Sequence, residues 1–179
     1  KLINADKQRL DIYTDFSLKS DLSHLSDNQR AMVGKLIDAS KIMDELFWKQ
    51  SFGENKDAFL AKLGDEKVRK FADINYGPWD RLNGDEAFLS SYKEKPLGAQ
   101  FYPADITKEE LNNADVEDKT GLYSVIKRDE QGKLYSVPYS KEYAAELAQA
   151  ADLLREASKL ADDKEFANYL NLRADALQK

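Results

Sequence analysis

The clearest structural signal in this sequence is the stretch from Ser26 to Gln50, which reads SDNQRAMVGKLIDASKIMDELFWKQ. It opens with a capping box, in which the Ser26 hydroxyl and the Gln29 side chain each satisfy a backbone N–H group that a first helical turn leaves without a partner. Apolar residues then recur at helical spacing, namely Met32, Val33, Leu36, Ile37, Met43 and Phe47. This pattern predicts one long amphipathic helix over residues 27–50.

The C-terminal part of the chain predicts a pair of helices. Apolar residues alternate four and three positions apart at Tyr143, Leu147, Ala150, Leu154, Ala157 and Ala161. Asp162-Asp163 offers a turn and a helix cap, because a carboxylate accepts hydrogen bonds from the first free N–H groups of a helix. The apolar stripe then continues at Phe166, Leu170, Arg173 or Ala174, and Leu177. We therefore predict an αα-hairpin over residues 140–178.

One segment predicts β-structure. Residues 122–128 and 133–137 are rich in Val, Ile, Leu and Tyr, and Asp129–Gly132 supplies turn residues between them, while Pro138 ends the second run. This indicates a β-hairpin over residues 122–138. The predicted fold class is mainly α (α+β), a helical domain with a C-terminal αα-hairpin and one small β-hairpin. A length of 179 residues suits a single domain over residues 1–179.

Composition excludes several functions. The net charge of −6 argues against nucleic-acid binding, which needs a basic surface, and no run approaches the ~18 apolar residues of a membrane span. The chain has no cysteine and one histidine, His24, which we interpret as an ordinary turn residue, the alternative being an anion contact. Catalytic zinc usually takes two or three imidazoles, and a serine triad needs a histidine beside its nucleophile. We therefore predict no catalytic residue, metal ligand or cofactor in this chain.

The stretch from residue 75 to residue 105 is a long loop, punctuated by glycine and proline and rich in aromatic residues. Loops of this length in compact domains are usually functional or docked. We predict that its side chains contact a substrate at Asn75, Tyr76, Trp79, Asp80, Arg81, Phe101 and Tyr102. The alternative is structural, with Trp79 in the core and Asp80 capping a turn, and composition favours it.

Five stretches resemble the N-terminal region of bacterial zinc hydrolases of the dipeptidyl peptidase III family. They are SHLS at 23–26, KIMDELFWKQ at 41–50, DINYGPWDRL at 73–82, GAQFYPAD at 98–105 and LNLRADAL at 170–177. A comparable region follows a Nudix domain in some plant proteins, so Nudix-labelled homologues are expected. The resemblance implies that zinc is held by a His-Glu-x-x-Gly-His helix and a downstream glutamate motif. This sequence contains neither.

The resemblance therefore implies a non-catalytic N-terminal portion of a longer zinc-dependent metallopeptidase, inactive alone. Its partners would be a downstream catalytic region of the same chain and a peptide substrate in a shared cleft, and the lack of a helix-stop signal at Lys179 accords with a parent that continues. The rival hypothesis is a stand-alone helical module that binds a peptide or protein. Paired carboxylates converging in a pocket would instead indicate an enzyme without histidine.

These hypotheses carry one structural expectation. If the helices at 27–50 and 140–178 normally rest on a missing region, an apolar patch should be exposed on this chain. In the isolated chain, a second copy of the same chain could bury that patch instead, by forming a homodimer.

Overall fold

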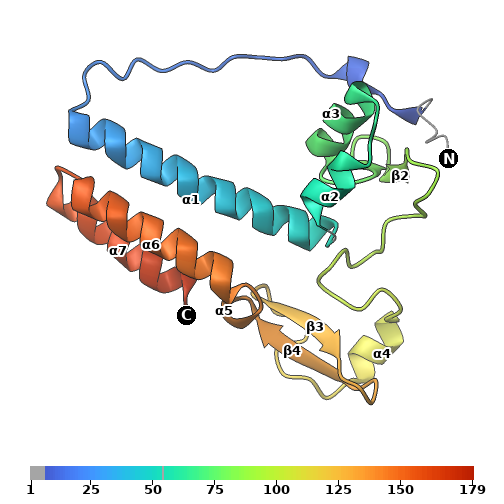
Figure 1. The fold of residues 1–179 in the computed structure, drawn as a ribbon. Coiled ribbons are helices and arrows are strands. Elements are labelled where there is room, and N and C mark those ends of the chain that lie inside the picture. The colour runs from blue at the N-terminus through green and yellow to red at the C-terminus, as the bar shows by residue number, and fades with distance from the viewer. Residues whose placement is uncertain (1–6, 54) are drawn as a thin grey trace. The chain divides into compact units, whose positions relative to one another are not determined.

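The computed structural model describes residues 7–53 and 55–179, and it is mainly helical with two small antiparallel sheets (Figure 1). These residues form two compact units. The aromatic unit comprises the described residues of Lys1–Phe16, Phe47–Val116 and Ile126–Tyr135. The helical unit comprises Ser17–Leu46, Glu117–Val125 and Ser136–Lys179. The predicted fold class is confirmed, while the assignment of one domain to residues 1–179 stays a prediction.

Helix α1 (Asp27–Ser51) is the predicted long helix. Its capping box is present, because the Gln29 N–H donates to the Ser26 hydroxyl at 3.1 Å and the Ser26 N–H donates to Gln29 Oε1 at 2.9 Å. The helix ends before Gly53, whose φ of +83° lies in the left-handed region that favours glycine. None of the described helices is apolar over a stretch long enough to cross a bilayer.

The aromatic unit holds short elements around a closed core. They are the 3₁₀ helix η2 (Leu10–Ile12), α2 (Lys56–Ala61), α3 (Glu66–Asn75), β1 (Trp79–Asp80), β2 (Glu86–Ala87) and α4 (Lys108–Asn113). Side chains of Asn55, Asp65 and Thr107 cap α2, α3 and α4. Rings fill the core, with Trp48 and Phe71 at 2% and 0% exposed and the Phe71 and Phe88 centroids 4.7 Å apart. Edge-on ring packing of this kind adds to simple apolar burial.

The helical unit contains the αα-hairpin, formed by α6 (Ala144–Leu160) and α7 (Lys164–Leu177). Asp163 caps α7 through the Phe166 N–H at 2.7 Å. Small residues let the two helices approach, since Ala150, Ala157 and Ala174 are fully buried. Ala174, not its neighbour Arg173, therefore continues the buried stripe. Helix α5 (Tyr139–Glu142) is separate from α6, because the non-helical Tyr143 (φ −114°, ψ 29°) divides the single helix that the pattern predicts.

The predicted β-hairpin is confirmed as β3 (Ser124–Arg128) and β4 (Leu134–Pro138). Asp129 Oδ1 accepts the N–H groups of Gln131 and Lys133, which fixes the turn. A second sheet was not predicted: β1 and β2 pair Trp79 with Ala87 and Asp80 with Glu86. Two-residue strands are too short to show a two-residue period, so the sequence pattern could not reveal them.

Candidate functional site

The segment from Asn75 to Arg81 is a tightly bonded turn. Asn75 is 3% exposed, and its amide donates to the Phe71 carbonyl at 2.9 Å while its Oδ1 accepts the Arg81 N–H at 3.0 Å. Tyr76 adopts a left-handed φ of 55° and ends α3. Because both ends of the Asn75 side chain are bonded to backbone groups, the course of the chain after α3 is set locally.

Trp79 and Asp80 are buried in this turn. Trp79 is 6% exposed and its indole N–H donates to the Lys93 carbonyl at 2.8 Å, while the Lys95 ammonium lies 5.8 Å from its ring centroid. Asp80 is 2% exposed, and it accepts hydrogen bonds from Arg9 Nε at 2.6 Å and from the Leu82 N–H at 3.1 Å. Trp79 therefore lies in the core and Asp80 accepts a hydrogen bond within the turn, while substrate contact by these two side chains stays a prediction.

The remaining predicted residues are less buried. The Arg81 guanidinium lies 5.5 Å from the Tyr76 ring centroid, and both side chains belong to the same turn as Asn75. Phe101 and Tyr102 are half-buried in a second segment, where the Phe101 carbonyl accepts the Ile126 N–H at 2.8 Å. A Cβ at Gly98 would lie 2.8 Å from the Tyr102 ring, so only glycine permits this approach.

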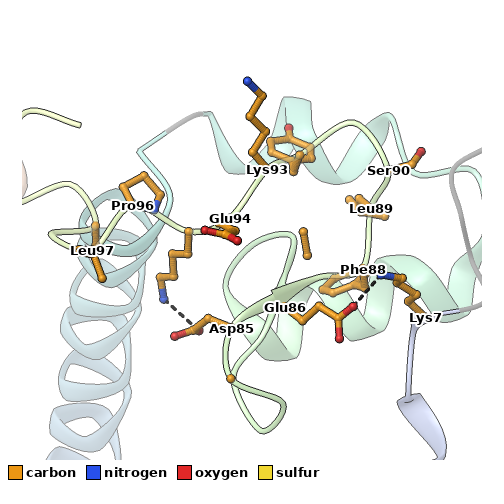
Figure 2. Close-up of a pocket in the computed structure, with 15 residues that line it drawn as sticks. Lys7, Asp85, Glu86, Phe88, Leu89, Ser90, Lys93, Glu94, Pro96 and Leu97 are labelled. Carbon is orange, nitrogen blue, oxygen red and sulfur yellow. Dashed lines mark hydrogen bonds and ion pairs between the residues drawn. The ribbon is translucent and has the colours of Figure 1, made fainter. Parts of the chain in front are cut away.

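A cavity of about 880 Å³ lies beside the turn, lined by Lys7 and by residues between Gly84 and Ala99 (Figure 2). Leu97 contributes exposed apolar surface, whereas Phe88 and Leu89 belong to the core beneath the lining and are each 1% exposed. Charged side chains surround them in two ion pairs, Lys7 with Glu86 at 2.6 Å and Lys95 with Asp85 at 3.5 Å. None of the predicted substrate-binding residues is among the described residues that line this cavity.

The electrostatics of the cavity follow from these pairs. The hydrogen bond and charge of Lys7 hold the pKa of Glu86 below its ordinary value, and a further hydrogen bond from Asn83 acts in the same direction. The side chains of Lys93 and Glu94 form no hydrogen bond or ion pair with other described residues. Among the described residues of the cavity wall, the Lys93 ammonium and the Glu94 carboxylate are therefore available to pair with a ligand.

Sequence reasoning missed the lining of this cavity. Its charged members are Lys7, Asp85, Glu86, Lys93, Glu94 and Lys95. A usable signal was present, because charges cluster between Gly84 and Pro96 around the apolar pair Phe88 and Leu89. Nothing in the local pattern could add Lys7, which lies 79 positions from its partner Glu86.

Metal-binding groups do not gather in this site. Across residues 7–53 and 55–179, the structure shows no cluster of three or more His, Cys, Asp or Glu side chains able to hold a metal ion. His24 is exposed in the turn that precedes α1. The absence of a catalytic residue stays a prediction.

Fold and site together define a mainly helical chain with a charged, partly apolar cavity beside an aromatic core. No protein-family model matches it. Its sequence is 29% identical over 231 residues to Nudix hydrolase 3 of Arabidopsis thaliana, a match that covers 95% of this chain and 30% of that protein.

The likeness to solved structures is close. DPP III from Caldithrix abyssi has a TM-score of 0.85 and 36% identity, over 94% of this chain and 34% of that one. Dipeptidyl-peptidase III from Corallococcus sp. strain EGB has a TM-score of 0.84 and 30% identity, over 99% and 36%. The resemblance to dipeptidyl peptidase III is confirmed in sequence and fold, and the chain spans about a third of the length of these relatives.

Proposed function

We propose that this chain is a non-catalytic N-terminal portion of a dipeptidyl peptidase III-like zinc hydrolase, which scaffolds a downstream catalytic region. The observation that carries the proposal is the likeness of almost the whole chain to about a third of two such peptidases, at 36% and 30% identity. The chain has a single histidine and no cysteine, so it cannot supply the imidazole pair that such a zinc site needs. The zinc is therefore expected in the downstream region.

The cavity of the aromatic unit is the part of this chain that we propose to line the peptide-binding cleft. Leu97, an exposed apolar residue of the lining, offers apolar surface, and Lys93 and Glu94 offer charges that no described side chain neutralises. Ligand sites commonly combine apolar walls with a few polar groups that orient the ligand. A peptide, which has charged and apolar groups along one chain, matches that chemistry.

The residues singled out in the sequence take two roles in this proposal. Tyr76, Arg81, Phe101 and Tyr102 are partly or fully exposed and are proposed to contact substrate. Asn75, Trp79 and Asp80 are buried, and they hold the cavity wall in place, since Trp79 bonds the Lys93 carbonyl.

The proposal is tested by a peptidase assay on two lengths of protein. The 179-residue chain with added zinc should not hydrolyse a dipeptidyl amide substrate, whereas the complete polypeptide loaded with zinc should. Turnover by the short chain, or a complete polypeptide that is folded and zinc-loaded but inactive, would contradict it.

The cleft is tested by substitution in the complete polypeptide. Reversing both charges (Lys93→Glu with Glu94→Lys) should raise KM for a charged peptide about tenfold, equivalent to ~1.4 kcal/mol of binding, with little change in kcat. Lys67→Glu is the matched control, because Lys67 is exposed on α3 and does not line the cavity. An unchanged KM in the double variant would show that this cavity is not part of the peptide-binding cleft.

The rival, a stand-alone binding module, makes a different prediction. The sequence that follows residue 179 would then lack a His-Glu-x-x-Gly-His helix, and the 179-residue chain would bind a peptide or protein helix with full affinity by itself. Titration calorimetry on both lengths distinguishes these outcomes.

A further inference from the structure

The helical unit carries an apolar groove between α1 and the α6–α7 pair, with a volume of about 380 Å³. Its lining includes Leu36 and Met43 of α1, Leu154 of α6, and Phe166, Tyr169 and Arg173 of α7. Large apolar side chains stay exposed here, with Met43 at 37%, Phe166 at 38% and Tyr169 at 53%. An exposed apolar surface of this kind marks an interaction site.

Polar contacts join α1 and the residues before it to the α6–α7 hairpin. Lys35 of α1 pairs with Glu156 of α6 at 2.6 Å, and the Ser26 hydroxyl donates to Asp162 at 2.7 Å. The hydrogen bond and charge of Glu156 raise the pKa of Lys35 above its ordinary value. The groove is therefore a built surface rather than a gap between unconnected helices.

The lining favours a helix as the occupant. The groove follows α7 from Phe166 to Leu177, which spans about 16 Å at the helical rise. An extended peptide would bury backbone N–H and C=O groups against apolar side chains, where they would lack partners. The hydroxyl of Ser40, one of the few polar groups in the lining, already donates to the Ile37 carbonyl. A helix satisfies its own backbone groups and presents an apolar stripe.

Charge specifies the occupant further. Arg173 is the charged residue among the described lining residues, and it forms no hydrogen bond or ion pair with other described residues. A carboxylate on the occupant would pair with this guanidinium. A second copy of the chain is disfavoured, because each copy carries a net charge of −6.

We infer that this groove docks an amphipathic helix that carries an apolar stripe and a carboxylate beside Arg173, supplied by the part of the polypeptide outside these 179 residues. The inference rests on the proposed function, since it takes the occupant from the same longer polypeptide. About two-thirds of each similar peptidase lies outside the region that this chain matches, so a parent protein of that length would have ample sequence to supply such a helix.

The experiment is carbene footprinting of the complete polypeptide and of the 179-residue chain. Labelling of Met43, Phe166 and Tyr169 should fall at least fivefold in the complete polypeptide. Arg173→Glu should restore labelling at least threefold there, because it places two carboxylates together. Lys164→Glu is the matched control, with the same charge change on α7 away from the groove, and should leave labelling within twofold of the parent.

Equal labelling of both lengths would overturn the inference. So would labelling of the short chain that falls with rising protein concentration while sedimentation shows a dimer, because a second copy would then fill the groove. Peptidase activity, measured on the same samples, keeps the two proposals apart. An active, zinc-loaded polypeptide with an open groove refutes the docking helix alone, whereas a covered groove in an inactive polypeptide refutes the proposed function alone.

Discussion

The aromatic unit and the helical unit bury their side chains differently. In the aromatic unit, Trp48, Phe71 and Phe88 are at most 2% exposed, so the rings close on one another. In the helical unit, alanines fill the contact between α6 and α7, while Tyr169 and Leu172 remain 53% and 59% exposed. Aromatic rings are large enough to enclose a small core from several sides. A contact made by alanines joins only the two helices that carry them and leaves their outer faces uncovered. The difference accords with the two proposals, a ligand cavity in the aromatic unit and a docked helix on the helical unit.

The largest expected effect tests the closure of the aromatic core. Phe71→Ala should lower the free energy of unfolding by about 3–5 kcal/mol, because it removes a fully buried ring and leaves a cavity. Phe166→Ala, the same substitution on the helical unit, should cost less than about 1 kcal/mol, because that ring is 38% exposed. Urea denaturation of both variants measures the contrast, and equal losses would contradict it.

A smaller effect tests the start of α7. Asp163→Ala should destabilise the chain by about 1 kcal/mol, because the Phe166 N–H loses its acceptor. Asp163→Asn keeps an acceptor of the same size and should cost much less. Thermal unfolding followed by circular dichroism measures both, and similar losses for the two variants would show that charge, not capping, is responsible.

A comparable effect of opposite sign is expected inside α1. Apart from its chain neighbours and the local helix backbone, no described atom lies within 4 Å of a Cβ placed on Gly34. Glycine is a poor helix former, so Gly34→Ala should stabilise the chain by about 0.5–1 kcal/mol. Gly132→Ala should instead destabilise it, because Gly132 has a φ of +80° in the hairpin turn. Chemical denaturation of the two variants measures the sign of each change in the free energy of unfolding. A loss of stability in Gly34→Ala would contradict the prediction, because it would mean that a neighbouring group packs against Gly34.

The smallest effect concerns acid stability of the aromatic unit. Arg128 donates to Glu110 at 2.5 and 2.8 Å and pairs with Asp105 at 3.2 Å, and these hydrogen bonds hold the pKa of both carboxyl groups below their ordinary values. A lowered folded-state pKa means that the stabilisation is complete above the ordinary pKa of the group, 4.5 for Glu110, and is lost as pH falls through the folded value.

Glu110→Gln should therefore lower Tm at pH 7, and its Tm should converge with that of the parent as the pH falls below 4.5 and through the folded-state pKa of Glu110. Glu109→Gln is the control, since Glu109 is exposed on the same helix and is not paired with Arg128. Parallel Tm curves for Glu110→Gln and the parent across this range would contradict the prediction.

Much of the fold was predictable because its signals are local. The Ser26 and Gln29 capping box, the cap at Asp163 and the hairpin turn at Asp129 all lie within a few residues of the groups that they bond. The candidate site was predictable only in part. Trp79 stood out by composition, but its burial depends on the Lys93 carbonyl and on rings from other elements.

The amino-acid sequence by itself determined the helix starts, the turn chemistry and the shortage of metal ligands, because each depends on residue type and short spacing. Only the tertiary structure decided that Lys7 meets Glu86 beside a cavity and that Arg173 lies in an apolar groove with no ion-pair partner among the described residues. A contact such as Lys7 with Glu86 joins residues far apart in the chain, and the lack of a described partner for Arg173 depends on how the other helices pack. A local sequence pattern carries no information about long-range contacts of this kind.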